Sequence, residues 1–185
     1  MMNHIDLSSV LRQTVACDLY SNLVTRPTGA AVRNQIERLL GDVHDRTLTV
    51  IDFSQVAMID FSCADEVIAK LLLRYEAENS PAEAYFLFRG VTEEHWEAIE
   101  AVLERRGLAL VLEQADGIHV VGALSEEDRR VWEMVQRFGR VALDELADAL
   151  ERPLQHVATA LDQLQRRRLV MRVGEEYAVV GAHRV

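Results

Sequence analysis

The first 122 residues alternate between short apolar runs and stretches that carry apolar residues at helical spacing. The short runs predict strands, at residues 4–11, 47–53, 84–88, 108–112 and 117–121. The periodic stretches predict helices, at residues 28–41, 62–77 and 91–107. The run 47–53 is apolar at nearly every position, which is typical of a central strand covered on both faces. Strands that alternate with helices favour an α/β fold, with helices packed on a mixed sheet.

The pattern changes at Ser125. Three helical periods then follow one another directly, and a hairpin with Gly174 in its turn comes after them. These elements are predicted at residues 125–139, 142–151, 153–169 and 170–180. Residues 122–125 are the expected joint. The sequence therefore predicts two domains, an α/β domain at 1–122 and a small α+β domain at 125–185.

Charge divides the chain at the same place. The formal net charge is −10, and residues 125–185 hold 11 acidic and 10 basic side chains, which leaves 19 acidic and 10 basic side chains for residues 1–124. The first module is therefore strongly acidic, while the second is close to neutral. Because phosphate backbones repel an acidic surface, nucleic acid is not expected to bind the first module.

The composition, 49% hydrophobic and 27% charged, is that of a globular chain. Cys17 and Cys63 are the only cysteines and form no CxxC pair, so a reducing compartment is expected. The start of the chain lacks a basic segment followed by a long apolar run, and no apolar stretch approaches the ~20 residues of a membrane helix. We expect a cytoplasmic protein without a signal peptide or a membrane segment.

The three helices and hairpin of the second module resemble the winged helix-turn-helix fold. The apolar spacing of the second and third helices carries the resemblance, together with Tyr177 and Val179, which return to the core. In that family the third helix enters the major groove of DNA. The resemblance implies as candidate DNA contacts Gln155, His156, Thr159, Gln163, Arg166, Arg167 and Arg172. The family usually has a glycine near Arg168, so the turn into the wing is expected to differ here.

Other residues on the same predicted surface disfavour DNA binding. Asp162, Glu175 and Glu176 would meet phosphates unfavourably, and the first three turns of the third helix carry no Lys or Arg. A winged helix that dimerises or docks a protein is therefore the alternative to one that binds DNA.

The stretch TVIDFSQVAMIDFSCADEVIAKLL, residues 49–72, runs from a buried strand into a helix. It is similar to the centre of STAS domains, the fold of anti-sigma factor antagonists, in which a buried strand and D-L-S-G-V precede an apolar pair, an acidic residue and a helix opened by Ser or Thr. DFSQV (52–56) and MID (58–60) match that pattern. SCADE (62–66) is closest to a divergent STAS-like group that pairs with histidine-kinase-type ATPases. The resemblance covers residues 1–122, and the docking surface that it implies comprises Asp60, Ser62, Cys63, Asp65 and Glu66.

In the switchable members of the family, the Ser or Thr directly after the acidic residue is phosphorylated. That position here is Phe61, which has no hydroxyl, so Ser62 is the candidate for a displaced switch. Ser62 also has a structural interpretation, because Ser62 and Asp65 have the spacing of a capping box, in which Ser62 caps the helix and Asp65 reaches back. Cys63 is interpreted as a small buried residue, the alternative being a thiol activated by the helix dipole.

The sequence contains no recognisable combination of catalytic residues. The six histidines are scattered without ligand spacing, so we expect no metal, no cofactor and no enzymatic activity. Arg26, Thr28 and Arg33 surround a predicted helix start, where an anion could bind, although surface arginines near a cap are the commoner case.

Two functional hypotheses remain. In the first, the chain is a regulatory protein whose STAS-like domain docks a protein partner, such as an ATPase of the anti-sigma type, and whose winged helix passes that state to DNA or a second protein. In the second, it is a DNA-binding transcription factor whose STAS-like domain forms a homodimer or senses a ligand.

Overall fold

The largest sheet in the computed structural model, which describes residues 2–6, 22–41 and 46–182, has five strands in the order β1-β3-β5-β6-β7. These strands are β1 (Met2–Asp6), β3 (Thr47–Asp52), β5 (Ala84–Arg89), β6 (Ala109–Gln114) and β7 (Gly117–Gly122). The first four run parallel, and β7 is antiparallel to β6. The prediction of a mixed α/β protein is confirmed. Residues 7–11 of the first predicted strand lie outside the described residues, as does Cys17.

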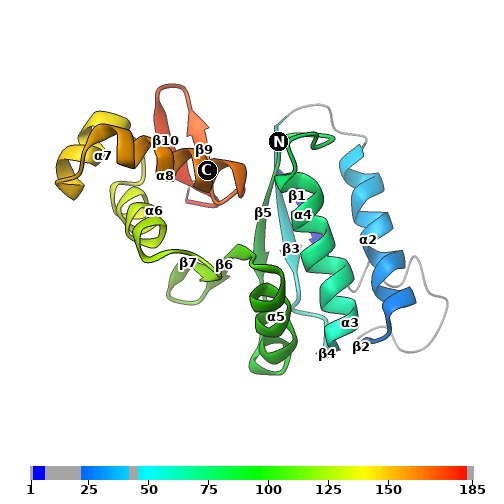
Figure 1. Cartoon of the computed structure of the whole chain (residues 1–185). Helices are drawn as coiled ribbons and strands as arrows, with labels where there is room; N and C mark the ends of the chain where they lie inside the picture. Colours follow the sequence, from blue (N-terminus) through cyan, green and yellow to red (C-terminus); the bar gives the residue numbers. More distant parts are fainter. Residues whose placement is uncertain (1, 7–21, 42–45, 183–185) are drawn as a thin grey trace.

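Three helical segments cover one face of this sheet (Figure 1). They are α2 (Arg26–Gly41), the continuous segment α3 (Phe61–Ala64), η1 (Asp65–Ala69) and α4 (Lys70–Glu76), and α5 (Glu93–Arg106). Because side chains alternate along a strand, every second sheet residue faces these helices, including Ile51, Phe86, Phe88, Leu110 and Leu112. Two short parallel strands, β2 (Asn22–Leu23) and β4 (Met58–Ile59), lead into α2 and α3 and bring their first turns together.

The start of α5 is fixed by a capping box. Thr92 is the N-cap, as the sequence predicts, but its partner is the buried His95. The backbone N–H of Thr92 donates to Nδ1 of His95 at 3.1 Å, and Nε2 of His95 donates to the carbonyl oxygen of Val56 at 2.7 Å. His95 therefore ties α5 to the loop between β3 and β4, just before the strand–helix junction.

The C-terminal module has three helices and a small sheet. Its elements are α6 (Glu126–Phe138), β8 (Val141–Ala142), α7 (Leu143–Leu150), α8 (Leu154–Arg166), β9 (Val170–Val173) and β10 (Glu176–Val179). The three strands are antiparallel in the order β8-β10-β9. The indole N–H of Trp132 on α6 donates to the carbonyl oxygen of Leu169 at 3.1 Å, which joins α6 to the chain that enters β9.

The second face of the large sheet packs against this module. Val50, Tyr85, Leu87 and Val111 point away from α2, α4 and α5 and share one buried cluster with residues of the module. Those residues include Trp132, Leu161, Leu164, Leu169 and Val180. The sheet is therefore covered on both faces, and the two modules have a common hydrophobic core.

Hydrogen bonds also connect the sheet to the C-terminal module along the edge formed by β7. Arg129 on α6 donates to the carbonyl oxygen of Val120 at 3.0 Å, and Gln136 donates to that of Ile118. Arg167 donates to the carbonyl oxygens of Gly107 and Ala123. Carbonyl groups along β7 are thus satisfied by α6, which covers an edge that would otherwise be open to another strand.

The turn before β9 has a side chain in an unusual backbone conformation. Arg168 adopts the left-handed conformation, with φ of 59°. The guanidinium of Arg168 donates to the carbonyl oxygen of Tyr75 at 3.0 Å and lies 5.5 Å from the centre of the Tyr85 ring. These contacts between the modules offset the roughly 1 kcal/mol that a side chain costs in this conformation.

Candidate functional site

The candidate site is the junction between β4 and α3. Asp60 is the N-cap of α3, and its carboxylate accepts the backbone N–H of Cys63 at 2.7 Å and that of Thr25 at 2.9 Å. The helix therefore begins at Phe61, one residue earlier than predicted, and the assignment of Ser62 as the N-cap is wrong. Asp60 takes the role because it stands one residue ahead of Phe61 and also binds the chain that enters α2.

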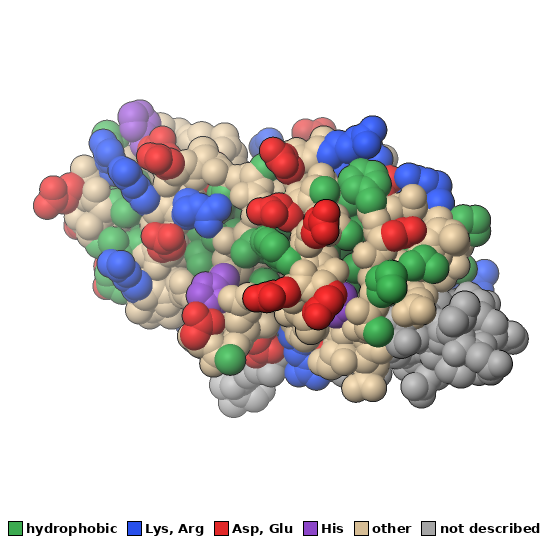
Figure 2. Space-filling view, turned by 90° about the horizontal axis from the view of Figure 1, so that it is seen from below, with side chains coloured by type: hydrophobic (Ala, Val, Ile, Leu, Met, Phe, Trp, Pro, Cys, Tyr) green, Lys and Arg blue, Asp and Glu red, His purple; other side chains and the backbone are tan. Residues whose placement is uncertain are grey.

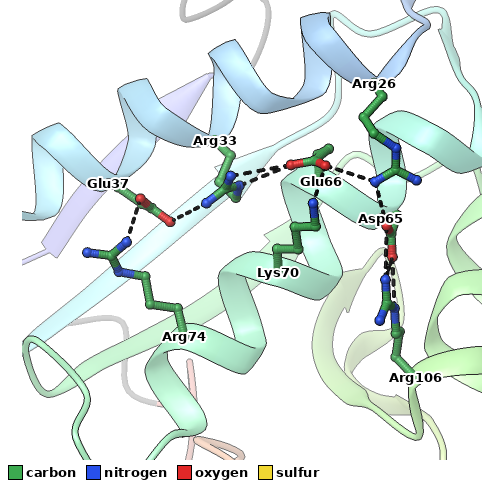
Figure 3. A network of polar contacts seen from close by, with 8 residues as sticks. All are labelled: Arg26, Arg33, Glu37, Asp65, Glu66, Lys70, Arg74 and Arg106. Atoms are coloured by element: carbon green, nitrogen blue, oxygen red, sulfur yellow. Dashed lines mark hydrogen bonds and ion pairs between the residues drawn. The ribbon is translucent and has the colours of Figure 1, made fainter.

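Asp65 does not reach back to the start of the helix, so the second half of the predicted capping box is also wrong. It accepts hydrogen bonds from Arg26 at 2.8 Å and from Arg106 at 2.9 Å. Glu66 accepts from the same Arg26 at 2.8 Å and pairs with Arg33 and Lys70. Figure 3 shows this network between α2, the π-helical turn η1 and α5, and Arg33 extends it to Glu37 and Arg74.

The network keeps two buried carboxylates charged. The Asp65 and Glu66 side chains are only 2% and 3% exposed. Burial acts to raise the pKa of Asp65, but hydrogen bonds from Arg26 and Arg106 outweigh it and leave the pKa below its ordinary value. For Glu66, burial again acts to raise the pKa, and hydrogen bonds from Lys70 and Arg26 lower it below the ordinary value. These two acids hold helices together and are not free for a partner.

The predicted anion site is occupied by the protein's own carboxylates. Arg26 pairs with Asp65 and Glu66, while Arg33 pairs with Glu66 and Glu37. The hydroxyl of Thr28 shares a hydrogen bond with that of Thr25 at 3.2 Å. Sequence spacing identified the arginines correctly as neighbours of a helix start. Of the acids that neutralise them, Asp65 and Glu66 come from η1, while Glu37 lies on α2 itself.

Cys63 is buried where two helices cross closely. Its thiol donates to the carbonyl oxygen of Thr25 at 2.9 Å, and burial raises the pKa of the thiol to about 12. The crossing depends on Gly29 of α2, because a Cβ there would lie 2.9 Å from the Cα of Cys63. A neutral, enclosed thiol is a packing residue and not a nucleophile.

The junction also has accessible apolar side chains, which sequence reasoning missed. Met58 is 51% exposed, and Phe61 is half-buried beneath the guanidinium of Arg105, which lies 5.4 Å from its ring centre. Ser62 is half-buried as well. Phe61 also lines a hollow of about 280 Å³ whose other wall is α5. The other lining residues of this hollow are Ile59, Asp60, Glu94, Glu97, Ala98 and Ala101. The residues of α5 reach this hollow only through the tertiary fold, so no local sequence motif could have predicted them.

The candidate DNA contacts fall into two groups. On α8, Gln155, His156, Thr159 and Gln163 are exposed, as is Arg166 at the end of the helix. Arg167 is bound to backbone carbonyls of the α/β module, as described above. Arg172 donates within its own hairpin, to the carbonyl oxygen of Gly174 and to Glu175.

Within the described ranges, no group of three His, Cys, Asp or Glu side chains is arranged to hold a metal ion. The same part of the chain has no helix with the length and apolar character needed to cross a membrane. No protein-family model matches the chain, and a search of curated proteins finds no match.

Proposed function

We propose that the chain is a cytoplasmic regulatory protein that acts by protein–protein interaction, with a STAS-like module that docks a partner and a winged helix coupled to it. The DFSQV and SCADE motifs support the STAS-like interpretation. The succession helix, strand, helix, helix and hairpin in residues 126–179 supports the winged helix. The proposed partner is a histidine-kinase-type ATPase of the anti-sigma kind.

One observation carries this proposal. Phe61 lines a hollow at the strand–helix junction where the motif falls, and the exposed Met58 adds apolar surface three residues before it. Exposed apolar side chains gathered at a concave site are typical of protein interfaces. Asp65 and Glu66, the two acids of the SCADE motif, are buried in ion pairs instead.

The second hypothesis, a DNA-binding transcription factor, has weaker support. A winged helix that binds DNA needs cations free to contact phosphates. Here Arg167 and Arg168 bind backbone carbonyls of the α/β module, and Arg172 is bound in its own hairpin. Arg166 remains exposed, next to the acidic Asp162. The common core of the two modules favours a winged helix that responds to docking at the first module.

The test is capture of partners from an extract of the native host by the full-length chain. Met58→Glu places a charge on the proposed surface. Leu39→Glu is the matched control, since Leu39 is another exposed apolar residue (42% exposed), on α2. We expect the wild type and the control to capture an ATPase of the histidine-kinase type that the Met58 variant loses. Equal capture of that ATPase by all three, or its absence from all three, would refute docking at this junction.

The same assay tests a displaced switch. Because Asp60 caps the helix, Ser62→Asp should fold normally while adding negative charge beside the hollow. We propose that phosphorylation at Ser62 weakens docking, so this variant should lose the partner while Ser62→Ala keeps it. Intact-mass analysis after incubation with the captured ATPase and ATP would detect one added phosphate on the wild type, and none on Ser62→Ala.

A further inference from the structure

A second surface lies on the other flank of α5. Two hollows of about 480 and 300 Å³ meet at Trp96, between α5 and the β6–β7 hairpin. The first is lined mainly by apolar side chains, among them Val91, Leu112 and Val121. The second continues along α5 past Leu103 to Gly122. Together they form a groove, called here the Trp96 groove, that runs beside α5.

An acidic ridge borders this groove. Glu93, Glu97, Glu100 and Glu104 are all exposed, and their spacing of four, three and four residues places them on one face of α5. Figure 2 looks at the end of the molecule where α5 lies in Figure 1, and it shows acidic side chains gathered among hydrophobic ones at the centre of this face. The ridge extends over roughly 16 Å of helix.

Among the described residues, the acidic side chains of the ridge have no cationic partner. Within the described part of the chain, none of these four glutamates forms an ion pair or a side-chain hydrogen bond. Like charges three and four residues apart destabilise a helix. Four unpaired acids beside an apolar groove therefore destabilise α5. They also provide negative charges with which cationic side chains of a partner can pair.

The backbone of the hairpin excludes one way to fill the groove. Carbonyl groups of β7 already accept hydrogen bonds from Arg129 and Gln136. Addition of another strand to this edge would break those bonds. A helix needs no backbone partners, and its side chains at positions i, i+4, i+7 and i+11 repeat the spacing of the ridge.

We infer that the Trp96 groove binds a basic amphipathic α-helix of a partner protein. The apolar side of that helix packs on Val91, Trp96 and Val121, which are partly exposed, and a row of its Lys or Arg side chains pairs with the acidic ridge. The groove and the Met58–Ser62 junction lie on opposite sides of the ridge, and Glu97 of the ridge also lines the junction hollow. The groove itself contains no residue of the junction, so the inference holds whether or not the junction binds an ATPase.

The test uses the full chain and a synthetic amphipathic helical peptide of leucine and lysine, about four turns long. Fluorescence anisotropy of the labelled peptide measures affinity. The indole N–H resonance of Trp96, assigned with Trp96→Phe, reports whether the peptide reaches the groove. We expect binding that weakens as salt concentration rises, and a shift of the Trp96 resonance while that of the buried Trp132 stays in place.

Two matched pairs of variants separate the groove from general attraction to an acidic protein. The ridge variant E93Q/E97Q/E100Q/E104Q should lose about tenfold in affinity. The control E127Q/E133Q/E145Q/E151Q removes the same charge from exposed sites on the C-terminal module and should change affinity by less than about twofold. Gln114→Lys, at the groove, should weaken binding, while Gln155→Lys on α8 should not.

The inference is overturned by any of three results. The first is equal weakening in the ridge variant and its control, since that would be attraction to net charge alone. The second is saturation without a shift of the Trp96 resonance. The third is failure of the wild type to bind the peptide at low salt. Circular dichroism of each variant verifies that its fold is intact.

Discussion

Glu76 stands at the end of α4, and its side chain meets the C-terminal module. One of its carboxylate oxygens is buried and has no hydrogen-bond partner in the described part of the chain. Burial raises the pKa of Glu76 to about 7, although Arg167 and Arg168 act to lower it. In the unfolded chain the pKa returns to 4.5. The folded state therefore retains the proton more strongly, and this group's contribution to stability is lost as the pH rises from about 4.5 through 7.

Glu76→Gln removes that dependence. We expect the variant to be more stable than the wild type near pH 8, by on the order of 2 kcal/mol, and similar to it below pH 5. Urea unfolding at both pH values measures the difference. Glu78→Gln is the control, because Glu78 is exposed, lies two residues after Glu76 and should have little effect at either pH. An equal gain for Glu76→Gln at both pH values would contradict the titration of this group.

The buried acid Glu66 has the opposite pH dependence. Its pKa is lowered in the folded state, so its contribution is present above the unfolded value of 4.5 and is lost as the pH falls through the folded pKa. Glu66→Gln leaves Arg26, Arg33 and Lys70 without a shared carboxylate and should cost about 3 kcal/mol at neutral pH. Denaturant unfolding across the acid range should show wild type and variant converging as the pH falls. A gap that stays constant down to acid pH would contradict this account.

The helix that follows β4 shows what local sequence can and cannot specify. Its apolar spacing predicted a helix over 62–77, within one residue of the observed Phe61–Glu76. The predicted capping box was wrong because the S-x-x-D spacing considers only neighbours in sequence, whereas the cap is decided by contacts with residues distant in sequence. Asp60 binds Thr25, and Asp65 binds Arg26 and Arg106, all far away in sequence. The π-helical turn Asp65–Ala69 likewise had no signal in the sequence.

The assignment of the cap can be tested directly. Asp60→Ala should destabilise the protein by about 1–2 kcal/mol, because the backbone N–H groups of Cys63 and Thr25 lose their acceptor. Ser62→Ala should stay within about 0.5 kcal/mol of the wild type, since Ser62 is not the N-cap. Chemical denaturation measures the free energy of unfolding of both variants. A larger decrease for Ser62→Ala than for Asp60→Ala would show that Ser62 is the N-cap after all.

At the level of the whole molecule, the five-stranded sheet contributes to the hydrophobic cores on both of its faces. The apolar run 47–53 correctly predicted a strand covered on both faces, and β3 is buried at nearly every position. The element that covers the second face could not be inferred. Tyr85 and Leu87 lie in a run that fits any buried strand, and periodicity does not reveal that their neighbours are Trp132 and Leu164.

Removal of the C-terminal module should therefore expose apolar surface. A fragment of residues 1–124 would leave Val50, Leu87 and Val111 facing water. We expect this fragment to bind the dye 8-anilinonaphthalene-1-sulfonate and to associate, while the full chain does neither and unfolds in one cooperative transition. A monomeric fragment without dye binding, or two separate transitions in the full chain, would show that the modules are stable independently.

The connection between the modules is very short. β7 ends at Gly122 and α6 begins at Glu126, so only residues 123–125 join them. Three residues reach about 10 Å even when fully extended. A detached module would stay at a high effective concentration next to its binding face and would return much faster than an untethered protein could compete for it. Any open form of the molecule is consequently brief, and a partner that depends on it must arrive during that interval.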